Sequence, residues 1–486
     1  AALRAGGGVR AALALLQRRH AEAVGPDGVA AAAVMLWNAA SHPDSAADVL
    51  EDAPEGAAAR GDLSGVAALV ALLGDLGAGL EARKTAAGAL GKLSLAHGGA
   101  ATVARAGALA ALAAGLLEAQ AGEQEPLARE CARGVVALVG ANDGAAAGAA
   151  SAAPRLVPAL CGLLAHGRPP SQEVAARALW LLASGRPAAV AAVLGEAGAV
   201  PALVGMLGLP WDNARASATK ALAALAAEPA GQVAIGRAGA LGPLAVLAEA
   251  ESGSTVEIRH GALMAITNLC NDTANCRAVV RGRGVSLLVA ALRGGEELRL
   301  RAAGAQALVN VATSPERRAE IADTGAIPAL VALLGVGGAG SRPSGDALTA
   351  VEAACNALSN LMMLEPLRQA VLDAGGVPPL VALLGCPSVT ASRAAALALQ
   401  YLASEPKGYD QIQRLHSAGS TQAPGDKAGK MDKMDKVGRP APPNRGIVRF
   451  QSGRCRWFRR PFDLRPAVTT IWARRGMLSF TTPPPP

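Results

Sequence analysis

Aromatic side chains are scarce in this chain of 486 residues. Only 2% of the residues are Phe, Trp or Tyr although 51% are hydrophobic, so Ala, Leu, Val and Gly carry most of the interior. A globular core of this size normally relies on large aromatic side chains. The shortage argues against one thick core and favours thin helical layers that pack on Ala and Leu.

Cysteine and histidine are also few, and neither is grouped. The seven cysteines form no C-x-x-C pair, and the six histidines are scattered without the spacing of metal ligands. Six of the cysteines lie in or beside expected helices, where they would act as small buried hydrophobic side chains in a reducing compartment. We therefore predict no metal site and no cofactor.

Catalytic motifs are absent once their context is considered. Residues 335–340 satisfy G-x-G-x-x-G, but a helical pattern precedes them where a nucleotide-binding loop needs a strand, so we predict an inserted loop. Residues 217–220 match the S-x-x-K of serine acyl enzymes, but no S-D-N or K-T-G follows. With no P-loop, G-x-S-x-G or H-E-x-x-H either, we predict that the chain is not an enzyme.

Long apolar runs are missing as well. No stretch of 18 or more apolar residues is free of charges and of Gly or Pro breaks, so we predict no membrane insertion. The first residues do not read as a signal peptide. We expect a cytoplasmic or nuclear location, or both.

What the chain does contain is one phrase repeated along most of its length. Residues 325–335 read Gly-Ala-Ile-Pro-Ala-Leu-Val-Ala-Leu-Leu-Gly, and residues 198–208 and 375–385 are close copies. Self-similarity at this period predicts a solenoid, in which each unit buries its apolar face against its neighbours. Aligned on its central leucine, the phrase recurs every 41 to 56 residues, at Leu13, Leu69, Leu112, Leu160, Leu203, Leu244, Leu288, Leu330 and Leu380.

Each unit is predicted to hold three helices and no strand. In residues 274–312, Gly pairs separate three segments, and in the longest of them apolar residues recur at spacings of three and four. The Pro of the repeated phrase fits the first turn of the second helix, where its missing N–H costs nothing. The Gly that precedes it fits the tight bend that ends the first helix.

Both halves of this pattern together resemble the armadillo family. The phrase Gly-Ala-Ile-Pro-Ala-Leu-Val-x-Leu-Leu is followed about 25 to 30 residues later by a motif that reads Ile-Thr-Asn-Leu at 266–269, Leu-Val-Asn-Val at 308–311 and Leu-Ser-Asn-Leu at 358–361. The resemblance implies an all-α, right-handed α-solenoid of about nine armadillo repeats over residues 1–417. Each repeat holds three helices, which that family names H1, H2 and H3.

The two ends of the chain differ from this pattern. The first residues read like the end of an H1, so we expect the sequence to be N-terminally truncated and to open inside a repeat. From Glu405 onward the chain carries 16 Lys and Arg against 6 Asp and Glu. Residues 418–486 are predicted to be a disordered, basic, Pro- and Arg-rich tail. Two explanations stay open: a tail that binds nucleic acid or acidic partners or acts as an import signal, or a gene-model artefact.

The resemblance also implies a concave groove lined by the H3 helices, which holds extended peptides. An Asn side chain offers both a donor and an acceptor to a peptide backbone. The predicted peptide-binding residues are amides of repeats six to eight, namely Asn268, Gln306, Asn310, Asn356 and Asn360. In repeats three to five the Asn position is assigned to Leu138, Leu181 and Ala224. These residues have no amide, so they interrupt the ladder of asparagines.

A second row lies nine residues before the Asn position, half a turn away at the edge of the buried stripe. The row consists of Arg83, Arg129, Arg215, Arg259 and Arg301. We expect the stems of these side chains to cover the core while their heads reach nearby carbonyls. The alternative is an acidic or phosphate-bearing ligand along the ridge.

Together these patterns predict a non-enzymatic scaffold that binds extended peptide segments of other proteins. Its nucleic-acid binding, if any, would belong to the basic tail. One alternative is the substrate-binding portion of a U-box and armadillo ubiquitin ligase whose U-box lies upstream. An importin-α-like cargo adaptor is disfavoured, because Met264, Gln306 and Asn356 stand where that subfamily places Trp.

Overall fold

The computed structural model describes residues 7–18, 25–50, 64–141, 143–293, 296–337, 345–386 and 388–420. Over these ranges the chain is helical and contains no strand. This confirms the all-α class and the solenoid of armadillo repeats. The predicted tail, apart from its first residues, and most of the predicted inserted loop lie outside the described residues, and the boundary at 417 stays a prediction.

The helices fall into the predicted H1, H2 and H3 rows. The H1 row is α4 (Pro43–Leu50), α7 (Gly99–Arg105), α12 (Pro187–Gly195), α15 (Pro229–Arg237), α18 (Thr273–Arg281), α21 (Pro315–Asp323) and α24 (Pro366–Asp373). The H2 row is α2 (Gly8–Arg18), α5 (Gly65–Leu73), α8 (Ala108–Ala121), α13 (Ala199–Met206), α16 (Leu241–Ala248), α19 (Gly284–Ala291), α22 (Ala326–Leu334) and α25 (Val377–Leu383). The H3 row is α3 (Pro26–Ala39), α6 (Leu80–Leu95), α9 (Glu125–Ala141), α11 (Pro169–Ala183), α14 (Asp212–Leu225), α17 (Val256–Leu269), α20 (Leu298–Val311), α23 (Asp346–Leu361) and α26 (Val389–Ala403).

Two helices depart from the three-helix unit. In the fourth repeat H1 and H2 form one continuous helix, α10 (Asp143–His166), which contains Pro158 of the repeated phrase. After the ninth repeat, α27 (Pro406–Ser420) packs on α25 and α26 in the place of a further H1. Short 3₁₀ turns occur at η2 (Leu76–Ala78), η3 (Ala250–Ser252) and η4 (Gly335–Gly337).

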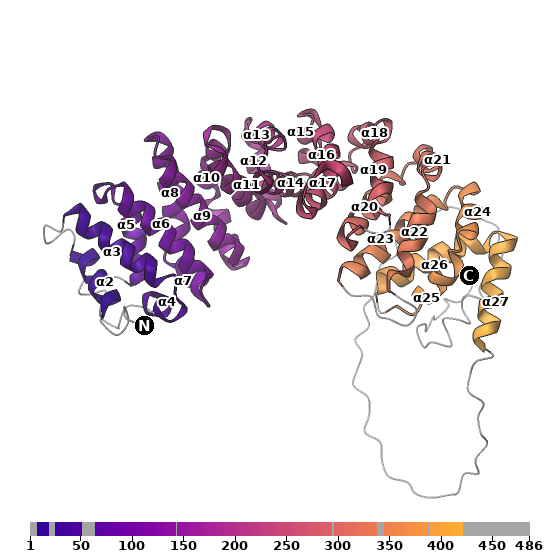
Figure 1. Cartoon of the computed structure of the whole chain (residues 1–486), viewed down its shortest axis with the longest axis horizontal. Coiled ribbons are helices and arrows are strands. Elements are labelled where there is room, and N and C mark those ends of the chain that lie inside the picture. Colours follow the sequence, from indigo (N-terminus) through magenta and orange to yellow (C-terminus); the bar gives the residue numbers. More distant parts are fainter. Residues whose placement is uncertain are drawn as a thin grey trace, which may run out of the picture.

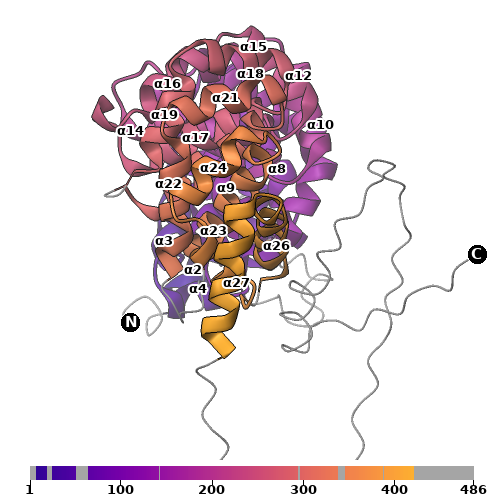
Figure 2. The ribbon, with the colours of Figure 1, turned by 90° about the vertical axis from the view of Figure 1, so that its right-hand side faces the viewer.

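The repeats stack into an arch (Figure 1). Helices α13, α15 and α18 lie along its outer side, and α11, α14, α17 and α20 lie along its inner side. Each H3 packs on the H3 of the next repeat, as α6 does on α9 and α20 on α23. In the view turned by 90°, α27 stands at the C-terminal end of the stack (Figure 2). The H3 helices therefore present one continuous inner face.

Backbone geometry explains the repeated phrase. Gly325 and Gly375 adopt φ values of 78° and 74°, in the left-handed region where a Cβ is strained, and so turn the chain sharply between H1 and H2. Pro378 then lies in the first turn of α25, as predicted. The Gly and Pro of the phrase thus mark where one helix ends and the next begins.

The core is a continuous layer of buried Ala, Leu and Val. Small residues let the H3 helices approach closely: a Cβ built on Gly91 of α6 would lie 3.3 Å from the Cα of Gly134 of α9. The central leucine of the phrase is fully buried at Leu203, Leu288 and Leu330. Thin layers of small side chains therefore suffice, as the scarcity of aromatics predicts.

Candidate functional site

Three of the predicted asparagines lie at equivalent positions on successive H3 helices, α17, α20 and α23. All three are half-buried, and each donates from its Nδ2 to a backbone carbonyl of the preceding H3. The bonds are Asn268 to Ala223 (2.8 Å), Asn310 to Thr267 (2.9 Å) and Asn360 to Val309 (3.1 Å). The side chains therefore tie neighbouring repeats together.

The carbonyls that they reach are those left unpaired where an H3 helix ends. At the end of α17 the backbone N–H of Asn271 bonds to the oxygen of Asn268 and not to that of Thr267. Helix C-termini leave such carbonyls without an intrahelical donor. The Nδ2 of Asn310 supplies the donor for Thr267 from the next repeat. The same shift occurs at the ends of α14 and α20, where Asn268 and Asn360 supply it.

The asparagines therefore contribute to the packing of the repeats and not only to the inner face. Their Nδ2 atoms are engaged inside the protein, so each side chain is held in one orientation. Their Oδ1 atoms keep acceptor capacity. Gln306 and Asn356 lie one turn earlier on α20 and α23 and are also half-buried.

In the third repeat the predicted register is wrong by one residue. Leu138 is fully buried and belongs to the core, not to the inner face. In the second half of α9, the residues partly or fully exposed on the inner face are Arg133, Val136, Ala137 and Gly140. Ala137 therefore takes the position that Asn occupies in repeats six to eight, which we call the ladder position. Leu181 of α11 and Ala224 of α14 are half-buried at the ladder position, as predicted. The interruption of the ladder in repeats three to five stands.

In the first two repeats the inner face carries Trp37 and Lys92. The Nζ of Lys92 lies 3.2 Å from the centre of the Trp37 ring and donates to Ser41 Oγ at 2.6 Å. Ser41 Oγ in turn donates to the carbonyl of Trp37 at 2.9 Å, the position that an Asn serves in later repeats. Burial lowers the pKa of Lys92.

The arginine row lies at the edge of the core, where we expected the side-chain stems to cover the core and the heads to reach nearby carbonyls. The Nε atoms of Arg83, Arg259 and Arg301 donate to carbonyls at the C-terminal end of their own H2, from Leu73 (2.8 Å), Ala248 (3.4 Å) and Leu292 (3.1 Å). Two of these guanidinium groups also bridge to the next repeat. Arg83 pairs with Glu118, and Arg259 binds both oxygens of Glu296, at 2.9 and 3.0 Å.

The other two members of the row differ. Arg215 pairs with Asp212 on the same helix, and its Nε is buried without a hydrogen-bond partner. The Nε of Arg129 is likewise buried and without a partner, and the corrected register of α9 places Arg129 eight residues before the ladder position. Arg83 and Arg259 have little guanidinium surface left for a ligand, since their side chains are 5% and 9% exposed.

A third set of capping side chains was not anticipated. Gln232, Arg318 and Arg368, on H1 helices, donate to the carbonyls of Ala226, Ala312 and Met362 at the ends of the preceding H3 helices. The repeating sequence signal is a long polar residue six positions after that H3 C-cap.

The cysteines of the described chain are buried, as expected. Burial raises the pKa of Cys131, Cys161 and Cys355 to about 12, so these thiols stay protonated. Cys276 differs, because a hydrogen bond with Cys270 and the Arg317 guanidinium, whose Nη1 is 2.8 Å from the sulfur, lower its pKa.

Over the described ranges, no three His, Cys, Asp or Glu side chains are grouped so that they could hold a metal. No single helix there has the length and apolarity to cross a membrane, although three sharply bent helix pairs meet the criteria of length and composition alone.

The arrangement of stacked three-helix repeats with one continuous inner helix face defines an α-solenoid. A family model, the armadillo/beta-catenin-like repeat, matches residues 365–404, which span α24 to α26. This match and the stacked repeats together support an armadillo-repeat protein.

One solved structure that matches most of this chain agrees with this fold. A crystal structure of an engineered protein is 27% identical over 85% of this chain and 92% of its own, with a TM-score of 0.68. A designed armadillo repeat protein, YIII(Dq)4CqI, is 24% identical over 51% of this chain and 99% of its own, with a TM-score of 0.45. No curated protein matches the chain.

Proposed function

We propose that this armadillo-repeat protein is a non-enzymatic scaffold that binds an extended segment of a partner protein along its H3 face. The observation that carries the proposal is the row of Asn268, Asn310 and Asn360, each oriented by its own inter-repeat hydrogen bond. Side chains that are fixed before binding lose little conformational freedom when a ligand arrives. Such a row suits a ligand with a regular backbone.

The chemistry of the row favours a peptide backbone. Because each Nδ2 is already engaged, the amide presents its Oδ1, which accepts a hydrogen bond from a backbone N–H. Stacked helices are ~8 to 10 Å apart, and an extended peptide advances ~3.3 Å per residue. Successive asparagines would therefore meet N–H groups two to three residues apart on one bound segment.

The amides one turn earlier widen this surface. Gln306 and Asn356 are half-buried on the same face and supply both donors and acceptors. They support a ligand that lies across the helices and not one that enters a single pocket. The location that fits this role is the cytoplasm, the nucleus or both.

The ubiquitin-ligase alternative uses the same surface. In that case the H3 face would hold the substrate, and the U-box would be supplied by a segment outside this sequence. The two readings differ only in what accompanies the repeats. Ubiquitin transfer by the full-length product to a bound segment would favour the ligase.

The test is peptide selection followed by mutation. A random peptide library displayed on phage is selected against the whole chain, and the affinities of the enriched peptides are measured by calorimetry. Changing Asn268, Asn310 and Asn360 together to Ala removes three acceptors at about 0.5 to 1.5 kcal/mol each. We expect binding to weaken roughly 10- to 1,000-fold.

The matched control is Asn275→Ala. Asn275 also donates an inter-repeat bond, from its Nδ2 to the carbonyl of Gln232 at 2.8 Å, but it is buried on α18 in the H1 row. It therefore reproduces the loss of one such inter-repeat bond without touching the H3 face. If the triple variant folds and binds as tightly as the wild type, the ligand does not use this row.

A further inference from the structure

Repeats one to five carry a different surface on the same H3 face. Leu95, the last residue of α6, is 71% exposed, which is unusual for a large apolar side chain inside a stack of repeats. It lines two hollows at once, one on either side of α6. The two hollows therefore meet at this side chain.

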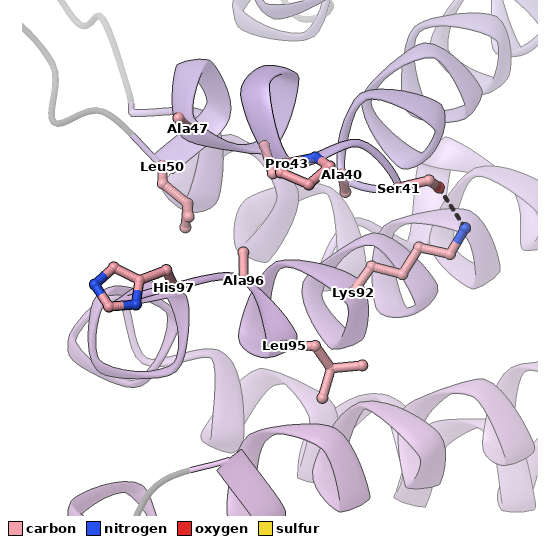
Figure 3. Close-up of a pocket in the computed structure, with 10 residues that line it drawn as sticks. Ala40, Ser41, Pro43, Ala47, Leu50, Lys92, Leu95, Ala96 and His97 are labelled. Carbon is pink, nitrogen blue, oxygen red and sulfur yellow. Dashed lines mark hydrogen bonds between the residues drawn. The ribbon is translucent and has the colours of Figure 1, made fainter.

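The first hollow lies between the turn that follows α3, helix α4 and the C-terminal end of α6, and it has a volume of about 650 Å³ (Figure 3). Pro43, Leu50, Leu95 and several alanines make its wall apolar. Figure 3 shows Lys92 on one side, with its Nζ reaching Ser41. The hollow thus combines an apolar wall with one cation.

The second hollow lies over α9, α11 and α14 and also measures about 650 Å³. It occupies the part of the face where the Asn ladder is interrupted. Small residues of α9 leave the space, and Val136, Trp180 and Leu181 line it. Its volume is large enough for a bulky side chain.

Of the Lys, Arg, Asp and Glu side chains that line the two hollows, three are cations and one is a carboxylate. Arg133, Arg177 and Glu173 line the second hollow, and Arg133 is paired with Glu130 at 2.7 Å. Arg177 is exposed. Lys92, in the first hollow, bonds to a hydroxyl and an aromatic ring and not to a carboxylate. Further along α14, Lys220 lies 5.2 Å from the Trp180 ring centre and 3.4 Å from Glu257.

We propose that the two hollows joined at Leu95 form one trough for an apolar and acidic part of the partner segment. Bulky apolar side chains of the ligand occupy the hollows, and carboxylates beside them meet Lys92 and Arg177. This inference rests on the proposed binding of an extended segment along the H3 face. It adds the chemical class of that segment: aromatic or leucine anchors flanked by Asp or Glu.

The trough and the amide row would bind different parts of one segment. From α9 to α17 there are three helix steps of ~8 to 10 Å each. An extended chain covers that distance in roughly 7 to 9 residues, at ~3.3 Å per residue. A ligand side chain bound over α9 should therefore be separated by that number of residues from the part that meets Asn268.

The test uses two synthetic fluorescent peptides and fluorescence anisotropy with the whole chain. The probe peptide contains two Phe, each flanked by Glu, and the control peptide replaces every Glu by Lys. Burying one large apolar side chain is worth roughly a 10- to 100-fold change in affinity. We expect the Glu peptide to bind at least 10-fold more tightly than the Lys peptide, and Leu95→Ser and Arg177→Glu each to weaken it about 10-fold.

Leu76→Ser is the matched control, because Leu76 is also 71% exposed but lies in η2, outside both hollows. Equal or tighter binding of the Lys peptide, no binding of either peptide, or equal effects of Leu95→Ser and Leu76→Ser would overturn the trough.

Peptides selected from the library separate this inference from the proposed function. If their binding depends on the three asparagines but not on Leu95, and they lack apolar and acidic residues, the scaffold function stands and the trough is wrong. If their binding depends on neither set, both proposals fail.

Discussion

Replacing Asn310 by Asp should test whether the inter-repeat caps stabilise the solenoid. Asn310 Nδ2 lies 2.9 Å from the carbonyl oxygen of Thr267, which receives no backbone N–H from the end of α17. An ionised Asp has the same shape but no donor, so it places two acceptors face to face. Leaving a part-buried polar group without a partner costs about 1 to 3 kcal/mol. We expect Asn310→Asp to lower the free energy of unfolding by that amount at pH 7.

Asn310→Ala should cost less. It also loses the bond, worth about 0.5 to 1.5 kcal/mol, but Ala regains up to ~0.7 kcal/mol of helix propensity at this position in the last turn of α20. The net loss should be between zero and about 1 kcal/mol. The order of stability is therefore wild type, then Ala, then Asp.

The Asp variant should also depend on pH with a defined sign. Protonated Asp can donate to the Thr267 carbonyl and ionised Asp cannot, so folding raises the pKa of Asp at position 310 above its unfolded value. The stabilisation is present below the unfolded pKa and is lost as pH rises through the folded pKa. Acidification should therefore reduce the gap between this variant and the wild type.

The assay is urea unfolding followed by far-UV circular dichroism, with Asn271→Asp as the control. Asn271 lies just after α17, is exposed, and makes no hydrogen bond from its side chain that ties repeats together. If Asn310→Asp destabilises the chain no more than Asn271→Asp, the capping role is refuted.

Two further substitutions test the rest of the framework. Arg259→Ala should cost about 3 kcal/mol, because it leaves the mostly buried Glu296 and the Ala248 carbonyl without their donor. Arg299→Ala, which breaks an exposed pair with Glu297, should cost at most about 1 kcal/mol. Equal urea midpoints for the two variants would contradict a stabilising role of the bonds between Arg259 and the next repeat. Gly325→Ala should cost about 1 to 2 kcal/mol because the φ of Gly325 is 78°. Gly335 has a negative φ and open space where a Cβ would lie, so Gly335→Ala should be close to neutral. Thermal unfolding of the two variants measures the difference.

The repeat fold was predictable because the signal is redundant. The central leucine recurs nine times, and Gly and Pro mark the same bend in several copies, so a weak copy is read from its neighbours. The exception is the fourth repeat, where Pro158 does not interrupt α10. One copy of the phrase does not specify a break that the stacked neighbours do not require.

The inner face was predictable only in part. Asn marks the ladder position in repeats six to eight, but α9 offers Val135, Val136, Ala137, Leu138 and Val139 in a row, and no polar residue fixes its phase. The capping role of the asparagines depends on which carbonyl at the end of the preceding H3 helix is left without a backbone donor. That point is set by the contact between repeats and not by either repeat alone.

The trough at Leu95 was also invisible in the sequence. A leucine in an Ala- and Leu-rich helix is expected to be buried, and only the packing of α6 between α3 and α9 shows that this one is exposed. Hollows form where small residues of neighbouring helices coincide in space, and their coincidence is a property of the stack.

The most direct test of binding along the H3 face is site-specific photocrosslinking. The photoreactive amino acid benzoylphenylalanine is placed at Gln306 or Asn356 on the H3 face, or at the exposed Ser286 of α19 in the H2 row. Each variant is irradiated with a library-selected peptide, and the adducts are mapped by mass spectrometry. The account predicts peptide adducts from positions 306 and 356, attached to peptide residues spaced along an extended chain, and none from position 286. Adducts from position 286 alone would contradict it.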